Sequence, residues 1–270
     1  MLFKIFIFLL LNCFINNIIA QDCISIKEYP FKASEQLDYD VFYNMGKLWV
    51  PAGRVRFSVY DSIYNNKKCF LFDGKGKTHK NYDWFFKVRD HYASLVEKDD
   101  FTPQKFIRNV NEGSFSLYYD YDFNCKNQKA NVYEKINGNE KTSTIDFPYC
   151  SYDVMASVYY ARTLDFEDVN IGDSISLKMM VDKEIYNNIY IIYTGKEIIK
   201  DQYGKEYSCI KFRPKLIEGT IFKDGEYMEV YVTDDKNRIP IYIEAEILVG
   251  SIKVYIKSIK NNKFAMSSMK

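Results

Sequence analysis

Asp234 to Ile252, with the sequence DDKNRIPIYIEAEILVGSI, is the stretch of this 270-residue chain that decides its fold. Proline suits the start or the edge of a strand, because it cannot donate a hydrogen bond to a neighbouring strand. Gly250-Ser251 supplies the positive φ that a tight two-residue turn needs. Between them, isoleucines alternate with tyrosine and glutamates. The stretch therefore predicts a turn, a strand with one buried face, a tight turn and a returning strand.

A fainter copy of this stretch lies in the first half of the chain. Pro103 and Pro240 are 137 residues apart, and Gly113 and Gly250 are separated by the same number. An Asp-Asp pair precedes each proline, at Asp99 and Asp234. A sequence period of this kind is best identified before a fold is assigned, because it determines the architecture. We predict an internal duplication; the alternative is a coincidence between two hairpin-rich stretches.

Strand patterns extend through the chain on both sides of these repeated stretches. Alternating apolar and polar residues predict strands through most of it, as in Val55, Phe57 and Val59 against Arg54 and Arg56. A single β-rich domain is predicted over 21–260, made of two similar halves at about 35–147 and 172–260 and followed by a frayed tail at 261–270. The fold class is all-β with one central helix. About fifteen strands close most economically as an antiparallel barrel or as two curved half-barrel sheets.

The helix that joins the two halves is predicted at 151–164. Val154, Val158 and Ala161 recur at helical spacing, which breaks the rhythm of the strands. Ser151 is the predicted N-terminal cap, and Asp153 suits the first helical turn.

The first twenty residues predict a cleaved signal peptide. Lys4 precedes a short apolar run, and the small residue Ala20 ends the segment. Asparagines interrupt the run, which disfavours the alternative of an uncleaved membrane anchor. We expect an exported protein with no transmembrane span after signal removal. The sequence has no Asn-x-Ser/Thr acceptor, which favours a bacterial periplasm or envelope.

Composition and cysteine spacing narrow the classes of function. Aromatic residues make up 17% of the chain, which favours strands. A net charge of +1 gives no reason to expect a nucleic-acid partner. The cysteines after the signal peptide are too far apart for a zinc ribbon or a C-x-x-C motif. They are read as buried small residues or as one disulfide whose pairing stays open; they are Cys23, Cys69, Cys125, Cys150 and Cys209.

Several of these stretches resemble one protein family. The segments 37–41, 86–92, 152–162 and 195–197, together with 234–240 and 250–252, are similar in type and order to an exported bacterial family called domain of unknown function 3108. The resemblance covers nearly all of the chain after the signal peptide. It implies a β-rich protein of the periplasm or envelope. The family has no established activity, so the resemblance assigns no functional residue.

The sequence carries no catalytic motif. His79 and His91 are the two histidines, and we read His91 as an ordinary strand residue. The Asp-Asp pairs lack the alternating oxygen ligands of a calcium loop and are interpreted as turn caps. We therefore predict no enzyme, no metal and no cofactor.

An aromatic cluster is the best candidate for ligand binding. Irregular aromatic segments at the rim of a barrel can line a pocket for a lipid or another apolar ligand. The predicted ligand-binding residues are Trp49, Tyr82, Trp84 and Phe85. The alternative is that these rings plug the core of a structural or interaction protein of the envelope. A hydrolase with an unrecognised site is the least favoured reading.

Four arginines are further candidates. Arg54, Arg56, Arg89 and Arg108 either point into such a cavity or form a solvated strand face.

Overall fold

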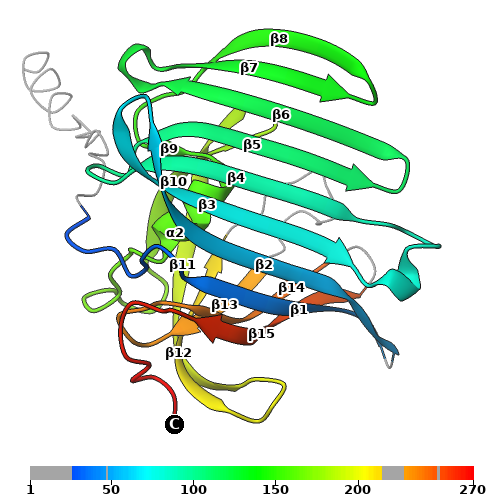
Figure 1. Ribbon diagram of the computed structural model, residues 1–270. Coiled ribbons are helices and arrows are strands. Elements are labelled where there is room, and N and C mark those ends of the chain that lie inside the picture. Colours follow the sequence, from blue (N-terminus) through cyan, green and yellow to red (C-terminus); the bar gives the residue numbers. More distant parts are fainter. Residues whose placement is uncertain (1–25, 47, 215–227, 248–249) are drawn as a thin grey trace, which may run out of the picture.

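The chain folds as one long β-sheet that curves around a short helix (Figure 1). The structure is a computed structural model and describes residues 26–46, 48–214, 228–247 and 250–270. The signal peptide predicted at 1–20 lies outside these residues. Within the described ranges, the predicted class, all-β with one α-helix, is confirmed.

The strands that precede the helix form an antiparallel meander. They are β1 (Gln36–Met45), β2 (Leu48–Tyr64), β3 (Lys67–Thr78), β4 (Arg89–Glu97), β5 (Pro103–Glu112), β6 (Phe115–Asn124), β7 (Lys129–Ile136) and β8 (Asn139–Asp146). Two 3₁₀ turns, η1 (Lys80–Tyr82) and η2 (Cys125–Asn127), lie in connections. The remaining elements are β9 (Ser151–Tyr152), the helix α2 (Val154–Ala161), β10 (Ser174–Val181), β11 (Glu184–Lys200), β12 (Glu206–Pro214), β13 (Met228–Thr233), β14 (Pro240–Glu246) and β15 (Ser251–Lys260).

All fifteen of these strands belong to one sheet. Its order is β8-β7-β6-β5-β4-β3-β2-β1-β15-β14-β13-β12-β11-β10-β9. The first and the last of the described strands are therefore neighbours, paired antiparallel from Gln36 opposite Lys260 to Asn44 opposite Ser251. This pairing joins the two halves into a continuous surface.

The second half repeats the strand pattern of the first. Each strand from β10 to β15 starts 136 to 139 residues after its counterpart in β1 to β6. The β7–β8 hairpin and the two-residue strand β9 are additions at the two ends of the sheet. The strand starts thus follow the spacing of about 137 residues found in the sequence.

The sheet is barrel-like but not closed, because β8 and β9 are free edges. The two ends nevertheless approach each other through the β10–β11 turn. Lys183 Nζ lies 2.5 Å from Glu134 Oε2 on β7, and Asp182 of the same turn forms an ion pair with Arg108 on β5. In a closed barrel, backbone hydrogen bonds would join the two ends of the sheet. Here side-chain ion pairs connect them instead.

The inner face of the sheet is built for contact with the helix. Phe72 on β3 stacks on Tyr159 of α2 with ring centroids 3.9 Å apart. Gly74 follows on the same face, and a Cβ atom there would lie 3.0 Å from the sulfur of Met155. Glycine is thus the residue that lets the helix approach this strand. The main hydrophobic core continues from these contacts into the second half at Leu177 and Met180.

The start of the helix differs from the prediction. Asp153, and not Ser151, is the N-terminal cap, since its carboxylate accepts hydrogen bonds from the Ala156 amide at 2.9 Å and the Ser94 hydroxyl at 2.7 Å. Ser151 and Tyr152 form β9, which pairs parallel with β10. The helix is accordingly shorter than the predicted range 151–164.

A buried ion pair fixes the end of the helix. Arg162 donates to both carboxylate oxygens of Glu35, at 2.6 and 3.0 Å, and to the Asn237 carbonyl at 2.9 Å. The two side chains are 3% and 1% exposed. One guanidinium therefore ties the approach to β1, the helix end and the β13–β14 loop together.

The prediction of a frayed tail at 261–270 is wrong. The Ser208 amide donates to the Ser268 carbonyl at 2.8 Å, and the Lys270 amide donates to the Glu206 carbonyl at 3.0 Å. The Ser268 hydroxyl donates to buried Asp235 at 2.7 Å. Asp235 also accepts the Asn237 amide at 2.9 Å, so its predicted role as a turn cap is confirmed. The tail is ordered because it satisfies polar groups of the β13–β14 turn.

Arg162→Met is expected to lower the free energy of unfolding by about 3–5 kcal/mol, because it leaves the Glu35 carboxylate buried without its partner. Urea unfolding measures this loss. The matched control is Arg213→Met, whose side chain is 45% exposed and pairs with Glu229; its loss is expected to stay below about 1 kcal/mol. Combining Arg162→Met with Glu35→Gln is expected to restore part of the loss. Equal effects of the two single variants would contradict the assignment.

Asp153→Asn is expected to change how stability depends on pH. Burial raises the pKa of Asp153 to about 6, despite hydrogen bonds that lower it. The folded state therefore holds this proton more tightly than the unfolded state, and stability falls as pH rises from about 4 to about 6. Asparagine keeps the cap acceptor and removes this loss, which is on the order of 3 kcal/mol. Chemical denaturation of both proteins across that range measures it; parallel pH profiles would count against it.

Candidate functional site

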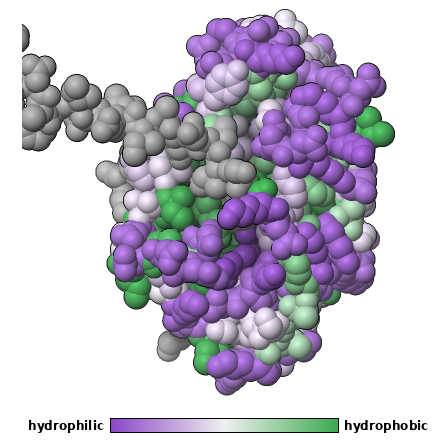
Figure 2. Space-filling view, turned by 90° about the vertical axis from the view of Figure 1, so that its left-hand side faces the viewer, coloured by the Kyte–Doolittle hydropathy of each residue, from purple (hydrophilic) through white to green (hydrophobic). Residues whose placement is uncertain are grey.

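The predicted ligand-binding aromatic residues stand at one end of the sheet and do not surround its interior. Trp84 and Phe85 are 83% and 80% exposed, in the β3–β4 connection that holds η1 and Tyr82. Trp49 is 49% exposed and packs on Phe42 beside the β1–β2 turn. The β1–β2 turn and the β3–β4 connection that carry these residues lie at strand ends, on the right in Figure 1. The opposite end, which faces the viewer in Figure 2, is mostly hydrophilic with separate small hydrophobic patches.

The prediction expected an apolar ligand in the interior of the sheet. In the described residues, side chains of the helix and of the sheet fill this interior. The helix α2 contributes Met155, Ala156, Tyr159 and Tyr160 to the main core. Aromatic rings from both the sheet and the N-terminal segment close around them, as Phe31 does at 5.1 Å from Tyr159. The alternative reading of a filled core is therefore the one that the described residues match.

A charged groove on the other face of the sheet is the candidate site. Its volume is about 680 Å³, and it crosses β15, β1, β2, β3 and β4. Cross-strand pairing aligns its side chains: Asp38 lies opposite Arg56, which lies opposite Lys75, which lies opposite His91. A parallel row begins at Asp40. The residues that line the groove are Asp38, Tyr39, Arg54, Val55, Arg56, Lys75, Gly76, Lys77, Arg89, Asp90, His91, Tyr203, Lys257 and Ser258.

Alternation along the strands explains why the groove is polar. On β2, Phe57 and Val59 face the hydrophobic core, so Arg54 and Arg56 face the groove. Of the four arginines singled out in the sequence, Arg54, Arg56 and Arg89 line the groove. Arg108 instead contacts Tyr92 and Asp182 at the opening between the two ends of the sheet.

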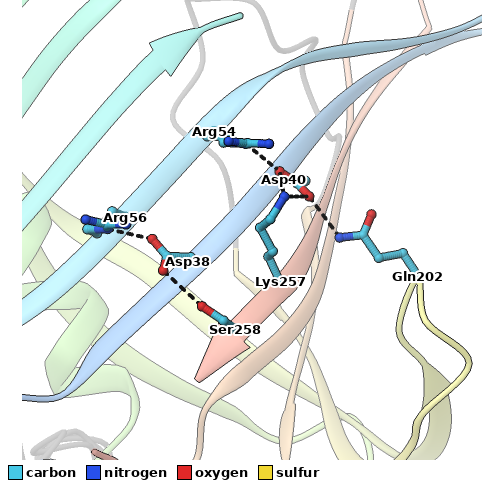
Figure 3. Close-up of polar contacts among 7 residues, drawn as sticks. All are labelled: Asp38, Asp40, Arg54, Arg56, Gln202, Lys257 and Ser258. Carbon is cyan, nitrogen blue, oxygen red and sulfur yellow. Dashed lines mark hydrogen bonds and ion pairs between the residues drawn. The ribbon is translucent and has the colours of Figure 1, made fainter. Parts of the chain in front are cut away.

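Two aspartates of β1 organise the groove, as Figure 3 shows. Asp40 accepts hydrogen bonds from Lys257 at 2.8 Å, Gln202 at 3.0 Å and Arg54 at 3.1 Å. Gln202 belongs to the β11–β12 turn, so Asp40 links the two halves of the chain. Burial alone would raise the pKa of Asp40, but these cationic and amide donors hold it below its usual value.

Asp38 has a similar set of donors. Arg56 donates at 2.6 Å, and Ser258 and Gln36 each donate at 2.9 Å. These hydrogen bonds outweigh burial and lower the pKa of the Asp38 carboxyl. Both aspartates are therefore firmly ionised and fix the arginines in place.

The two arginines bind these aspartates in a way that leaves donors unused. Each contact runs through Nε alone, at 3.1 Å for Arg54 and 2.6 Å for Arg56. Among the described residues, neither guanidinium has a partner for its two terminal nitrogens, and the side chains are 53% and 54% exposed. A guanidinium with free terminal N–H groups presents a planar fork that matches a carboxylate, a phosphate or a sulfate.

His91 and the cysteines do not form a catalytic arrangement in the described residues. His91 Nε2 lies 2.5 Å from Asp73, which also pairs with Lys75 at 2.9 Å. Cys69, Cys125 and Cys209 are free thiols, and burial raises the pKa of Cys125 to about 11 and that of Cys209 to about 12. Such thiols are poor nucleophiles.

Cys150, in contrast, is disulfide-bonded. The described part of the chain holds no group of His, Cys, Asp and Glu side chains arranged for a metal ion.

Sequence reasoning missed the residues that come to the groove from the second half. Lys257, Ser258 and Tyr203 line it, and Gln202 braces it. Their signal was absent because Lys257 and Ser258 reach the first half through the β1–β15 pairing, and Gln202 and Tyr203 reach it from the β11–β12 turn. In the described ranges, no helix combines the length and the apolar character of a membrane span.

Comparison with known proteins places the fold and the family. The crystal structure of a β-barrel-like protein of domain of unknown function DUF1849 from Brucella abortus is similar, with a TM-score of 0.55 and 9% sequence identity. The match covers 85% of this chain and 98% of that one. No curated protein matches the sequence. The model of the family described as protein of unknown function (DUF3108) matches residues 38–257. The chain is therefore a member of the DUF3108 family, as its motifs indicate.

Proposed function

We propose that this chain is an exported, non-enzymatic binding protein of the bacterial envelope whose ligand is an anion held in the charged groove. The observation that carries the proposal is the geometry of Arg54 and Arg56. Both are oriented by aspartates through Nε, and both keep their terminal N–H groups available to a ligand. A groove of about 680 Å³ is in the size range of small-molecule sites.

An apolar ligand inside the β body is the less supported alternative. Such a ligand needs an apolar cavity, and α2 with its surrounding rings fills the described interior. Of the aromatic residues expected to line that cavity, Trp49, Trp84 and Phe85 are exposed at the strand ends, and Tyr82 is half-buried in the β3–β4 connection. A purely structural protein of the envelope, with a filled core and no ligand, is the second alternative and differs from our proposal in predicting no binding in the groove.

Export and the absence of catalysis rest on separate observations. The N-terminal sequence has the charged start, apolar run and small terminal residue of a signal peptide. A disulfide at Cys150 suits an oxidising compartment such as the periplasm. The raised thiol pKa values, and the fact that His91 contacts Asp73 and no nucleophile among the described residues, support a binding protein over a hydrolase.

Arg54→Gln/Arg56→Gln is expected to weaken anion binding about tenfold or more, because each charged hydrogen bond contributes about 1.5–3 kcal/mol. Calorimetric titration at low salt with pyrophosphate, citrate and a sulfated disaccharide measures the affinity and distinguishes the three anion classes. Arg213→Gln is the matched control, because this arginine lies on β12 outside the groove and already pairs with Glu229 through two nitrogens. Unchanged affinity in the double variant, or no binding of any probe, would favour the purely structural alternative.

The exported protein is expected to begin at Gln21. Intact-mass measurement of the full-length gene product, recovered from the periplasm of a bacterial host, checks this prediction. A recovered chain that still carries residues 1–20 would instead support an uncleaved anchor.

A further inference from the structure

Large hydrophobic side chains are exposed together at one end of the sheet. They stand on or beside three alternate connections: Trp49 beside the β1–β2 turn, Trp84, Phe85 and Phe86 between β3 and β4, and Phe115 after the β5–β6 turn. In an antiparallel meander, every second connection lies at the same end. We call this set of five side chains the aromatic end. An exposed patch of this kind marks an interaction site more often than an accident of folding.

The loop that carries three of these rings is held in place. The Asp83 carboxylate accepts hydrogen bonds from Thr78 at 2.9 Å and Arg89 at 2.6 Å, which fixes the loop to both flanking strands. The Phe85 and Phe86 amides donate to the Tyr82 carbonyl at 3.0 and 2.9 Å. The loop is therefore built to point Trp84 and Phe85 outward, with their rings edge to face at 5.9 Å.

The β3–β4 loop is positive where it meets solvent. Lys80 and Lys87 are exposed in this loop, whose carboxylate, Asp83, is already neutralised by Arg89. Lys253 lies 5.3 Å from the ring of Trp49 and forms an ion pair with Glu244 at 2.8 Å. Glu112, at the end of β5, shares a hydrogen bond with Asp90, and burial raises the pKa of its carboxyl. Lysines that surround exposed aromatic rings complement a surface that is anionic outside and apolar beneath.

From this arrangement we propose that the aromatic end docks on the surface of an anionic phospholipid bilayer. Trp84 and Phe85 enter the interfacial layer, while Lys80 and Lys87 contact lipid phosphates. The rings protrude from separate connections, so a deformable partner can surround each of them. Tryptophan is suited to this layer, because its ring is apolar and its N–H group stays near polar headgroups. Each lysine near such a surface adds electrostatic attraction. This proposal is independent of ligand binding in the groove.

The chain provides its own probe for this test. Trp49 and Trp84 are its two tryptophans, so Trp49→Phe leaves Trp84 as the single indole fluorophore. With vesicles of phosphatidylethanolamine and phosphatidylglycerol, we expect the emission of Trp84 to shift to the blue and to be quenched by brominated lipid. With vesicles of phosphatidylcholine alone, we expect a much weaker response that high salt leaves unchanged.

Co-sedimentation of the mature chain with the same vesicles tests the residues. Trp84→Ala/Phe85→Ala is expected to lower the partition coefficient about tenfold or more, since it removes two large rings from the contact. Lys80→Glu/Lys87→Glu is expected to abolish the preference for anionic vesicles. The matched control is Tyr60→Ala/Ile63→Ala, which removes side chains that are 46% and 76% exposed near the β2–β3 turn at the opposite end.

Three results would overturn the proposal. They are an unshifted Trp84 emission, equal partitioning of the aromatic variant and the control variant, and a dimer in the absence of lipid that Trp84→Ala/Phe85→Ala converts to a monomer. The last result would assign the aromatic end to self-association. None of these outcomes depends on whether Arg54 and Arg56 bind an anion, so the two proposals fail separately.

Discussion

The ion pair between Glu35 and Arg162 is the constraint on which the rest of the structure depends. Removing two charges from water is costly, and their attraction compensates only when the geometry is good and the remaining donors are satisfied. Here the contact is bidentate, and the Asn237 carbonyl takes a further hydrogen bond from the guanidinium, whereas the buried Nε has no hydrogen-bond partner among the described residues. The Arg162 side chain also lies over the rings of Phe31 and Tyr159. A small displacement of the helix end would break all of these contacts together.

That ion pair explains why the curved sheet contains the helix and yet does not close into a barrel. The helix end is fixed to the first strand and to the β13–β14 loop, so α2 stays inside the curved sheet. With the helix in place, the edges β8 and β9 do not pair with each other, and side-chain contacts at the β10–β11 turn bridge the opening. Among the described residues, the interior around α2 is packed with side chains.

Much of the fold is predictable from the sequence, because local signals such as strand-starting prolines and turn glycines lie where the sheet needs them. Pro103 and Pro240 start β5 and β14, and the Gly113 and Gly250 turns precede β6 and β15, as the repeat predicts. The family and the all-β class follow from the same stretches. The errors have local causes. Asp153 outcompetes Ser151 as the cap because its carboxylate reaches both Ala156 and Ser94. The tail is ordered by Asp235 and Asn237, which are distant in sequence.

The candidate site was less predictable for a topological reason. Alternation shows that Arg54 and Arg56 share a face but does not show which face closes around a helix. The predicted aromatic residues were expected at the rim of a hollow barrel, and a filled interior leaves them exposed at the strand ends. Lys257 and Gln202 come to Asp40 from more than 160 residues away, from β15 and from the β11–β12 turn, and no local pattern encodes this proximity.

The pairing of β1 with β15 has a kinetic consequence. Strand β1 has β2 beside it early, but its other neighbour, β15, is synthesised after all the other described strands. Contacts between residues so far apart in sequence carry a large loop-closure entropy and slow the folding of a chain. The N-terminal half therefore emerges with an unpaired β1 edge, which is a site for wrong pairing until β15 has been synthesised. Nascent segments of a chain with this topology need protection from one another until β15 pairs with β1.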